Sequence, residues 1–410
     1  MLINNDIQWK HNYLVGGDWK LSRDRLSYTP IPVSELLREL KDLSQIMMSL
    51  AFCSVFFMDD TIYREITRLD DRVDLLKGYL IMQASLATRD KEDAEKMLSV
   101  YDMAISVDKI SEVSKDLAEL AYNKLNINLG SHVYSNSSTN FIYSLKINGN
   151  SPFRNRRIAE LYSITGEYFD VLAIRRRDKY ILSPEEETLL LEDDVVYLKG
   201  FTDTIKKIIK MNGVEGVAKG IAIEPEKIDD LIYIKNLSEF MLDLAYGALF
   251  TKSIQLADEI GSMEEALDQV TKSLKEEEIG WDINPKEKLG IIKYIDSCEN
   301  IGDAALDMTY SLRMGIEPHP VIEAFLEEAD ERYMTISIPE SASGWELADL
   351  GLTRMGVDIL AIKREGYWYI NPLIKGFPLK GGEELIIQYF EEAEKEVIDR
   401  LRSIGINPHQ

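Results

Sequence analysis

The chain has 410 residues, and 47 basic against 71 acidic side chains give it a net charge of −24. At roughly 100–200 residues per domain, this length predicts two to four domains, each able to bury a core. The acidic excess argues against a nucleic-acid-binding protein and against docking on anionic lipid, because both need a surplus of Lys and Arg.

Cysteine usage and hydropathy indicate the compartment. The two cysteines, Cys53 and Cys298, form no CxxC motif and no disulfide framework. The N-terminus lacks the pattern of a signal peptide, and the most apolar run, residues 46–58, is shorter than the roughly 20 residues that a membrane helix needs. We therefore expect a cytoplasmic protein with no transmembrane segment. The phosphate-binding glycine loops, the GxSxG elbow and HExxH are absent from the sequence, which favours a protein that is not an enzyme.

The first half of the chain divides into a helical and a mixed unit. Residues 1–30 have no counterpart later in the chain and form an N-terminal arm. Apolar residues at three- and four-residue spacing, with breaks near 59–60, 88–90 and 126–128, predict an antiparallel helical bundle over 31–128. A Ser- and Asn-rich connector then leads into a unit over 140–211.

The unit over 140–211 shows short strand patterns next to short helices. Its predicted elements are a strand near 141–147, a helix over 158–165 capped by Gly166, strands at 170–174, 180–182 and 195–198, and a helix over 202–211. This order predicts a small β-α-β-β-α-β or similar α+β domain.

The second half repeats this arrangement. Residues 41–57 align with 235–251 at an offset of 194, and residues 171–184 align with 359–372 at an offset of 188. Two independent alignments in the same order indicate an internal duplication. We therefore expect an α+β multidomain fold, in which two all-α bundles (31–128 and 225–332) alternate with two small α+β domains (140–211 and 333–404). In the last unit the pattern predicts a helix over 345–355.

Two sets of motifs resemble known families. KDLSQIMMSLAFCSVFFMDD and IYREITRLDDRVDLL resemble the helical bundle of the PhoU family. VLAIRRRDKYILSP and ILAIKREGYWYINP resemble the TrkA C-terminal domain, also called RCK-C. The alternation resembles PhoU–TrkA-C tandem fusion proteins over nearly all of residues 31–404. The resemblance implies a regulator of cation transport, with potassium as the expected ion and a membrane transporter or channel subunit as partner. Such a protein would be peripheral to the membrane only through that partner.

The PhoU resemblance implies acidic E(D)xxxD metal motifs on the bundle helices. Asp108 and Glu112 have this spacing in the first unit, and Glu299 and Asp303 have it in the second. Carboxylates one turn apart on a helix can share a hard or borderline cation, here a divalent or iron-type metal. The alternative is a solvated acidic face, because a chain with 71 acids contains many such pairs by chance. If these acids bind a metal, the resemblance implies a PhoU-type signalling adaptor for phosphate or other transport.

The TrkA-C resemblance implies dimerisation and, in some relatives, binding of a small nucleotide such as cyclic di-AMP between two copies. Apolar side chains can stack on a base, Asn can read its edge, and Arg or Lys can meet phosphate. The alternative is a surface hairpin in which the proline only ends a strand. The two units would pair within one chain as a pseudo-dimer or across a homodimer. The matching residues are Ile174, Arg175, Arg176, Ser183 and Pro184 in the first unit, and Ile362, Lys363, Arg364, Asn371 and Pro372 in the second.

Overall fold

The structure is a computed structural model of the whole chain. It describes residues 30–125, 140–177, 179–213, 225–278, 280, 283–352, 355–370 and 378–406. The N-terminal arm and two of the candidate ligand residues, Asn371 and Pro372, lie outside the described residues.

Three long helices and one short helix make up the first helical unit. They are α1 (Val33–Phe57), α2 (Ile62–Ala87), α3 (Lys91–Lys96) and α4 (Leu98–Tyr122). α1 is buried on nearly every face, because α2, α4 and the first sheet all pack against it. It is also the one described helix that is long and apolar enough to cross a membrane, and 94% of its apolar window is buried inside the molecule. That degree of burial is typical of a core helix.

The second helical unit has the same long-helix arrangement. It consists of α8 (Pro225–Thr251), α9 (Ile254–Glu278), α10 (Pro285–Met308), α11 (Tyr310–Arg313) and α12 (Pro320–Leu326). α10 begins with proline, whose missing N–H costs nothing in the first turn of a helix.

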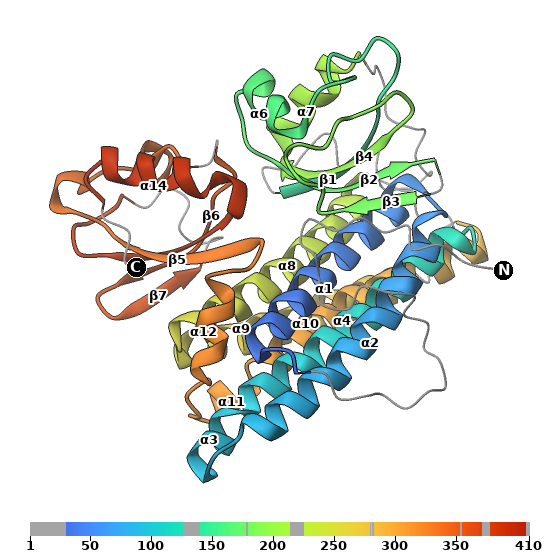
Figure 1. The fold of residues 1–410 in the computed structure, drawn as a ribbon. Coiled ribbons are helices and arrows are strands. Elements are labelled where there is room, and N and C mark those ends of the chain that lie inside the picture. Colours follow the sequence, from blue (N-terminus) through green and yellow to red (C-terminus); the bar gives the residue numbers. More distant parts are fainter. Residues whose placement is uncertain are drawn as a thin grey trace.

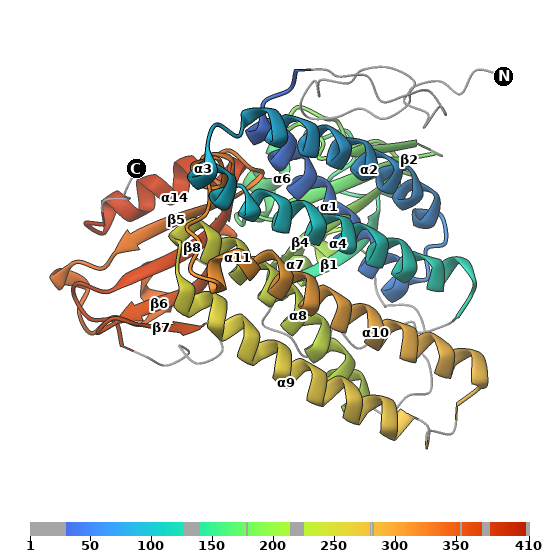
Figure 2. The ribbon, with the colours of Figure 1, turned by 90° about the horizontal axis from the view of Figure 1, so that it is seen from below.

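The two helical units form one array with one continuous core. α4 packs along α10, so the three long helices of each unit lie together in a single layered bundle (Figures 1 and 2). The buried side chains of both units belong to one hydrophobic cluster, which also includes the first sheet. The sequence predicted two bundles, and the structure joins them because apolar side chains of α4 and α10 pack together in one shared core.

The first α+β unit has four antiparallel strands in the order β1-β4-β2-β3. Its helices run before β2 and after β4, so the order along the chain is β-α-β-β-β-α, which is the order of the individual elements predicted from the sequence. The elements are β1 (Asn140–Lys146), α6 (Ile158–Thr165), β2 (Asp170–Arg176), β3 (Lys179–Leu182), β4 (Val195–Phe201) and α7 (Thr202–Met211).

The second α+β unit has the equivalent strand order, β5-β8-β6-β7. The register of β6 on β8 shifts between Ile359 and Ala361, as that of β2 on β4 shifts between Val171 and Ala173. The elements are β5 (Glu331–Ser337), the short 3₁₀ turns η1 (Glu340–Ala342) and η2 (Leu347–Leu350), β6 (Asp358–Arg364), β7 (Tyr367–Ile370), β8 (Glu384–Phe390), η4 (Glu391–Ala393) and α14 (Glu394–Ser403).

One predicted helix of this unit is absent. In place of a helix over 345–355 the described residues contain only the 3₁₀ turn η2, which ends at Gly351 with a positive φ of 69°. A glycine in the left-handed region stops a helix, so the turn ends after four residues.

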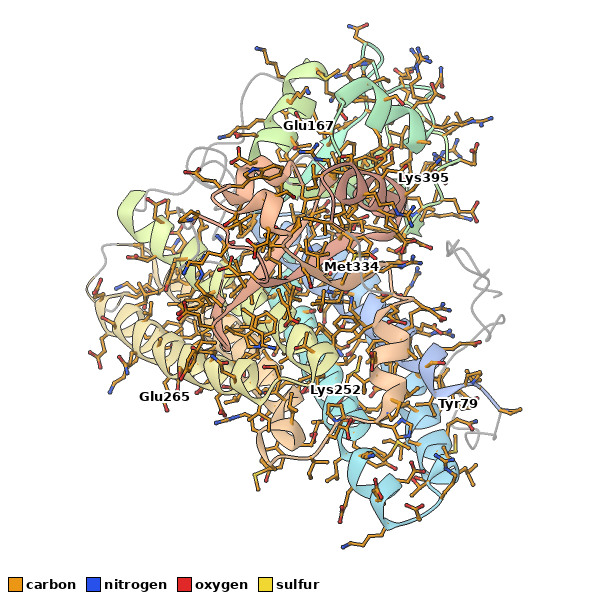
Figure 3. The ribbon with its side chains drawn as sticks, turned by 90° about the vertical axis from the view of Figure 1, so that its left-hand side faces the viewer. Tyr79, Glu167, Lys252, Glu265, Met334 and Lys395 are labelled. Atoms are coloured by element: carbon orange, nitrogen blue, oxygen red, sulfur yellow. The ribbon has the colours of Figure 1, made fainter. Side chains whose placement is uncertain are left out.

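Both α+β units lie on the same side of the helical array (Figure 1), and Lys199 of the first unit contacts Glu331 of the second. The first unit packs its sheet on α1, and β6 of the second packs on α8, where Gly247 lets the helix approach Leu360. Tyr168 of the first unit packs against the core of the second. Side chains fill the space between the ribbons, as Figure 3 shows around Met334 of β5.

Candidate functional site

The four predicted metal ligands do not come together in one site. Asp108 on α4 forms an ion pair with Lys77 of α2, whereas Glu112 is exposed one turn further on. Glu299 on α10 accepts a hydrogen bond of 2.6 Å from Lys275. The ammonium groups of Lys77 and Lys275 therefore stand beside Asp108 and Glu299, where a metal ion would otherwise bind.

A different group of acids lies close enough together to hold an ion. Ligand atoms of Glu264, Asp268 and Asp303 are all within 4.8 Å of one another, between α9 and α10. Of these, only Asp303 was among the predicted ligands, although Glu264 and Asp268 have the same i,i+4 spacing and could have been found by it. Lys109 of α4 donates to Asp303 at 3.0 Å and partly neutralises the cluster.

The basic residues of the first hairpin are held by acids of the chain itself. Arg176 donates to both carboxylate oxygens of Asp194, at 2.9 and 2.8 Å, and to the carbonyl of Leu189. Arg175 donates to the Tyr197 hydroxyl at 3.2 Å and lies 3.4 Å from Asp59 at the end of α1.

The second hairpin repeats this pattern. Arg364 forms an ion pair with buried Glu383 and donates to the carbonyl of Pro378 at 2.7 Å, and Lys363 donates to Glu384 at 3.1 Å. Ile174 and Ile362, the candidate stacking residues, are buried in the cores of their units. Arg175, Arg176 and Arg364 would each have to give up an internal partner before binding a phosphate group.

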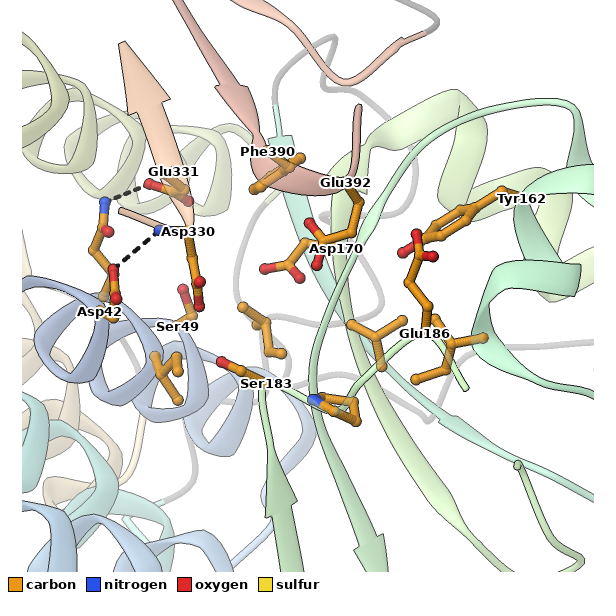
Figure 4. A pocket seen from close by; sticks show the side chains of 16 residues that line it. Asp42, Ser49, Tyr162, Asp170, Ser183, Glu186, Asp330, Glu331, Phe390 and Glu392 are labelled. Carbon is orange, nitrogen blue, oxygen red and sulfur yellow. Dashed lines mark hydrogen bonds between the residues drawn. The ribbon is translucent and has the colours of Figure 1, made fainter. Parts of the chain in front are cut away.

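A small pocket lies where α1, the first α+β unit and the second α+β unit meet (Figure 4). Its cavity volume is about 30 Å³. Two candidate ligand residues, Ser183 and Pro184, line it, and Ser183 has an unusual positive φ of 37°. The lining includes six acids and no Lys, Arg or His among the residues that the structure describes: Asp42, Asp170, Glu186, Asp330, Glu331 and Glu392.

Next to this pocket, a buried polar network ties the two α+β units to the array. Lys199 of β4 donates to Glu331 of β5 at 2.6 Å, so an ion pair links the two units directly. Gln388 of β8 donates to the same carboxylate at 3.0 Å and to Asp243 of α8 at 3.2 Å. Lys41 of α1, fully buried, donates to the carbonyl of Glu331 at 3.3 Å. We call these five residues the junction network.

The charges of the junction network shift the pKa values of its two carboxyl groups. Burial alone would raise the pKa of Glu331, but Lys199 and Lys41 hold the pKa of its carboxyl below the usual value. Burial, and then the charge of Glu331, raise the pKa of Asp243 to about 7. Apolar periodicity could not reveal this network. Its sequence signal was Lys41 in an apolar helix, because a lysine in such a pattern needs a buried partner.

Comparisons with known proteins give structural neighbours only. No family model and no curated protein matches the chain. PhoU from Pseudomonas aeruginosa is 13% identical and covers 68% of this chain and 93% of its own, with a TM-score of 0.38. The GsuK channel is 15% identical, covers 77% of this chain and 66% of its own, and has a TM-score of 0.18. The GsuK RCK domain is 14% identical over 77% of this chain and 79% of its own, with a TM-score of 0.17.

The neighbours thus include a PhoU protein and an RCK domain, the two kinds of protein that the motifs resemble. TM-scores of this size do not establish a shared fold across the chain. The function must therefore be argued from this chain's own residues.

Proposed function

We propose that this protein is a non-enzymatic cytoplasmic regulator of cation transport, with potassium as the expected ion. In this proposal the two α+β units sense a ligand and hold the assembly together, and the helical array contacts a membrane transporter or channel subunit. The motif resemblances of the two kinds of unit support this division of roles.

The observation that carries the proposal is the direct connection between the two α+β units. Lys199 and Glu331 pair across them at 2.6 Å, and Gln388 extends the same network to Asp243 of the helical array. A ligand that favours one arrangement of the two units would therefore shift the helices as well, provided that it binds the two arrangements with different affinities.

We also propose that the α+β units pair within one chain and descend from a duplication. Their equivalent strand orders and register shifts support this, as does the packing of Tyr168 against the second unit's core. A pseudo-dimer of this kind leaves no need for a second chain to complete the pairing.

The transport role is tested by deleting the gene in the source organism and measuring uptake of radioactive rubidium, a tracer for potassium. We expect a changed uptake rate that the wild-type gene restores. Unchanged uptake at both low and high external potassium would contradict the transport role.

The ligand role is tested by calorimetry of the full chain with cyclic di-AMP. We expect binding heat that falls in Arg176→Ala and Arg364→Ala and stays in Arg156→Ala, an exposed arginine of the first unit. An absence of heat at tens of micromolar nucleotide in the wild type would remove this ligand from the proposal.

A second function, a metal-loaded PhoU-type signalling adaptor, is favoured by one observation, the cluster of Glu264, Asp268 and Asp303. Elemental analysis of the purified chain would detect a bound metal, and Asp268→Asn should remove it. Asp258→Asn, which changes an exposed acid of the same helix, is the matched control. Equal metal content in both variants would rule out this cluster as the site.

A further inference from the structure

One carboxylate at the junction has an oxygen without a partner. Asp42 lies on α1 and is only 5% exposed. Its Oδ1 atom accepts a hydrogen bond from the backbone N–H of Asp330 at 3.4 Å, but Oδ2 is buried and has no hydrogen-bond partner in the described part of the chain. A buried, ionised carboxylate with an oxygen that accepts no hydrogen bond lowers the stability of the fold unless it is protonated or faces a cation.

The unpartnered oxygen belongs to a side chain that lines the acidic pocket at the junction. Figure 4 shows Asp42 and Asp330 on one side of this pocket and Asp170, Glu186 and Glu392 on the other. These acids come from three parts of the fold: α1, the first α+β unit and the second α+β unit. Glu331, a further acid of the lining, pairs with Lys199 of the junction network.

The size of the pocket limits its occupant. A cavity needs roughly 10–15 Å³ by the same measure to hold one water molecule, so about 30 Å³ accommodates an ion with one or two waters. The polar lining consists of carboxylates, the hydroxyls of Ser49, Tyr162 and Ser183, and one amide, with no His or Cys among the described lining residues. Oxygen ligands alone favour hard cations such as Ca²⁺ and Mg²⁺ over zinc or copper.

We propose that this junction pocket binds one hard divalent cation, with Asp42 supplying a direct ligand oxygen. The site goes beyond the proposed transport function, since it would exist whatever partner the array contacts. An ion held by Asp42 of α1 would face acids that both α+β units contribute to the pocket lining. Occupancy therefore stabilises one arrangement of the two α+β units on the array.

The electrostatics of Asp42 agree with this assignment. Burial, and then the neighbouring charge of Asp330, raise the pKa of the Asp42 carboxyl well above its usual value, although Lys41 and Arg38 oppose the shift. A divalent ion would relieve the repulsion between Asp42 and Asp330. The cluster on α9 and α10 differs in this respect, because Lys109 already donates to its Asp303.

The test is a thermal unfolding series on the full chain, dialysed against chelator and then given CaCl₂, MgCl₂ or KCl at constant ionic strength. A cation at about 100 times its dissociation constant should raise the Tm of a chain of this length by roughly 3 °C. The two divalent arms decide between calcium and magnesium, and calorimetry should give one ion per chain.

Two isosteric variants locate the ion. Asp42→Asn removes the unpaired charge without changing the shape of the side chain, so it should fold and lose the divalent-dependent rise in Tm. Asp268→Asn, in the cluster on α9 and α10, should keep that rise. Asp330→Asn provides a second variant of the pocket if Asp42→Asn does not fold, and it should weaken the rise.

Two results would overturn the proposal. One is a wild-type Tm that does not respond to divalent cations up to about 10 mM, well above the dissociation constants of weak calcium modules. The other is a rise that Asp268→Asn abolishes and Asp42→Asn retains, which would place the ion between α9 and α10. Both results are independent of rubidium uptake, so a failure here is separable from a failure of the transport role.

Discussion

The clearest stability prediction concerns Asp243 of the junction network. This carboxyl on α8 lies half-buried between the array and the second sheet, where it accepts a hydrogen bond from Gln388 at 3.2 Å. Replacement of Asp243 by Asn keeps an oxygen that can accept the same bond and removes the charge. We expect Asp243→Asn to stabilise the protein at neutral and higher pH.

The magnitude follows from the raised pKa of Asp243. A rise from the ordinary value of 3.8 to about 7 corresponds to about 4 kcal/mol, at roughly 1.4 kcal/mol per pH unit. The sign follows from linkage. The unfolded chain loses this proton near pH 4 and the folded chain only near pH 7, so stability falls between these values and is then constant. Because Asp243 keeps some contact with solvent, we expect about 2–4 kcal/mol at pH 8.

The assay is thermal unfolding of the wild type and Asp243→Asn at pH 5 and pH 8. At pH 8 the variant should melt roughly 2–5 °C higher, and the difference should shrink to about two fifths of that at pH 5. Asp229→Asn, at an exposed position of the same helix, should not differ from the wild type at either pH. A variant that is less stable than the wild type at pH 8, or a difference independent of pH, would refute the reasoning.

Two further predictions concern packing within the helical array. Arg72 donates to buried Glu39 across α2 and α1 at 2.8 Å, so Arg72→Met should cost about 3–5 kcal/mol in urea unfolding, and adding Glu39→Gln should recover most of it. A loss below about 1 kcal/mol in the single variant would contradict this. At Gly302 of α10, a new Cβ would lie 2.5 Å from the side chain of Leu267, so Gly302→Ala should cost about 1–3 kcal/mol. If Gly302→Ala instead stabilised the protein by roughly 1 kcal/mol, as alanine does in an exposed helix, this prediction would be refuted. Such a result would show that α9 and α10 can move apart at this point.

Local features of the fold followed from the sequence because neighbouring residues decide them. The helix Ile158–Thr165 ends at Gly166, whose φ of 70° places it in the left-handed region as the pattern predicted. The hairpins around Arg176 and Arg364 also lie where the two aligned segments placed them. The helix predicted over 345–355 failed for the same local reason, since Gly351 takes a left-handed conformation inside the range.

The candidate sites were less predictable, because carboxylate spacing along one helix does not show what the neighbouring helix offers. Asp108 and Glu299 have the predicted spacing to a second acid, but Lys77 and Lys275 occupy the facing positions. The three acids that do meet come from two helices, which the order of residues along one helix cannot show.

The sequence by itself determined most of the elements and the alternation of helical and mixed units. Only the tertiary structure decided that α4 and α10 join the helical units, and that Lys41 and Asp42, adjacent on one helix, have different surroundings. Lys41 reaches Glu331, 290 residues away, whereas Asp42 faces the acidic pocket. Periodicity shows which face of a helix is buried. The partner that covers that face, and hence the energy of each buried charge, depends on contacts between distant parts of the chain.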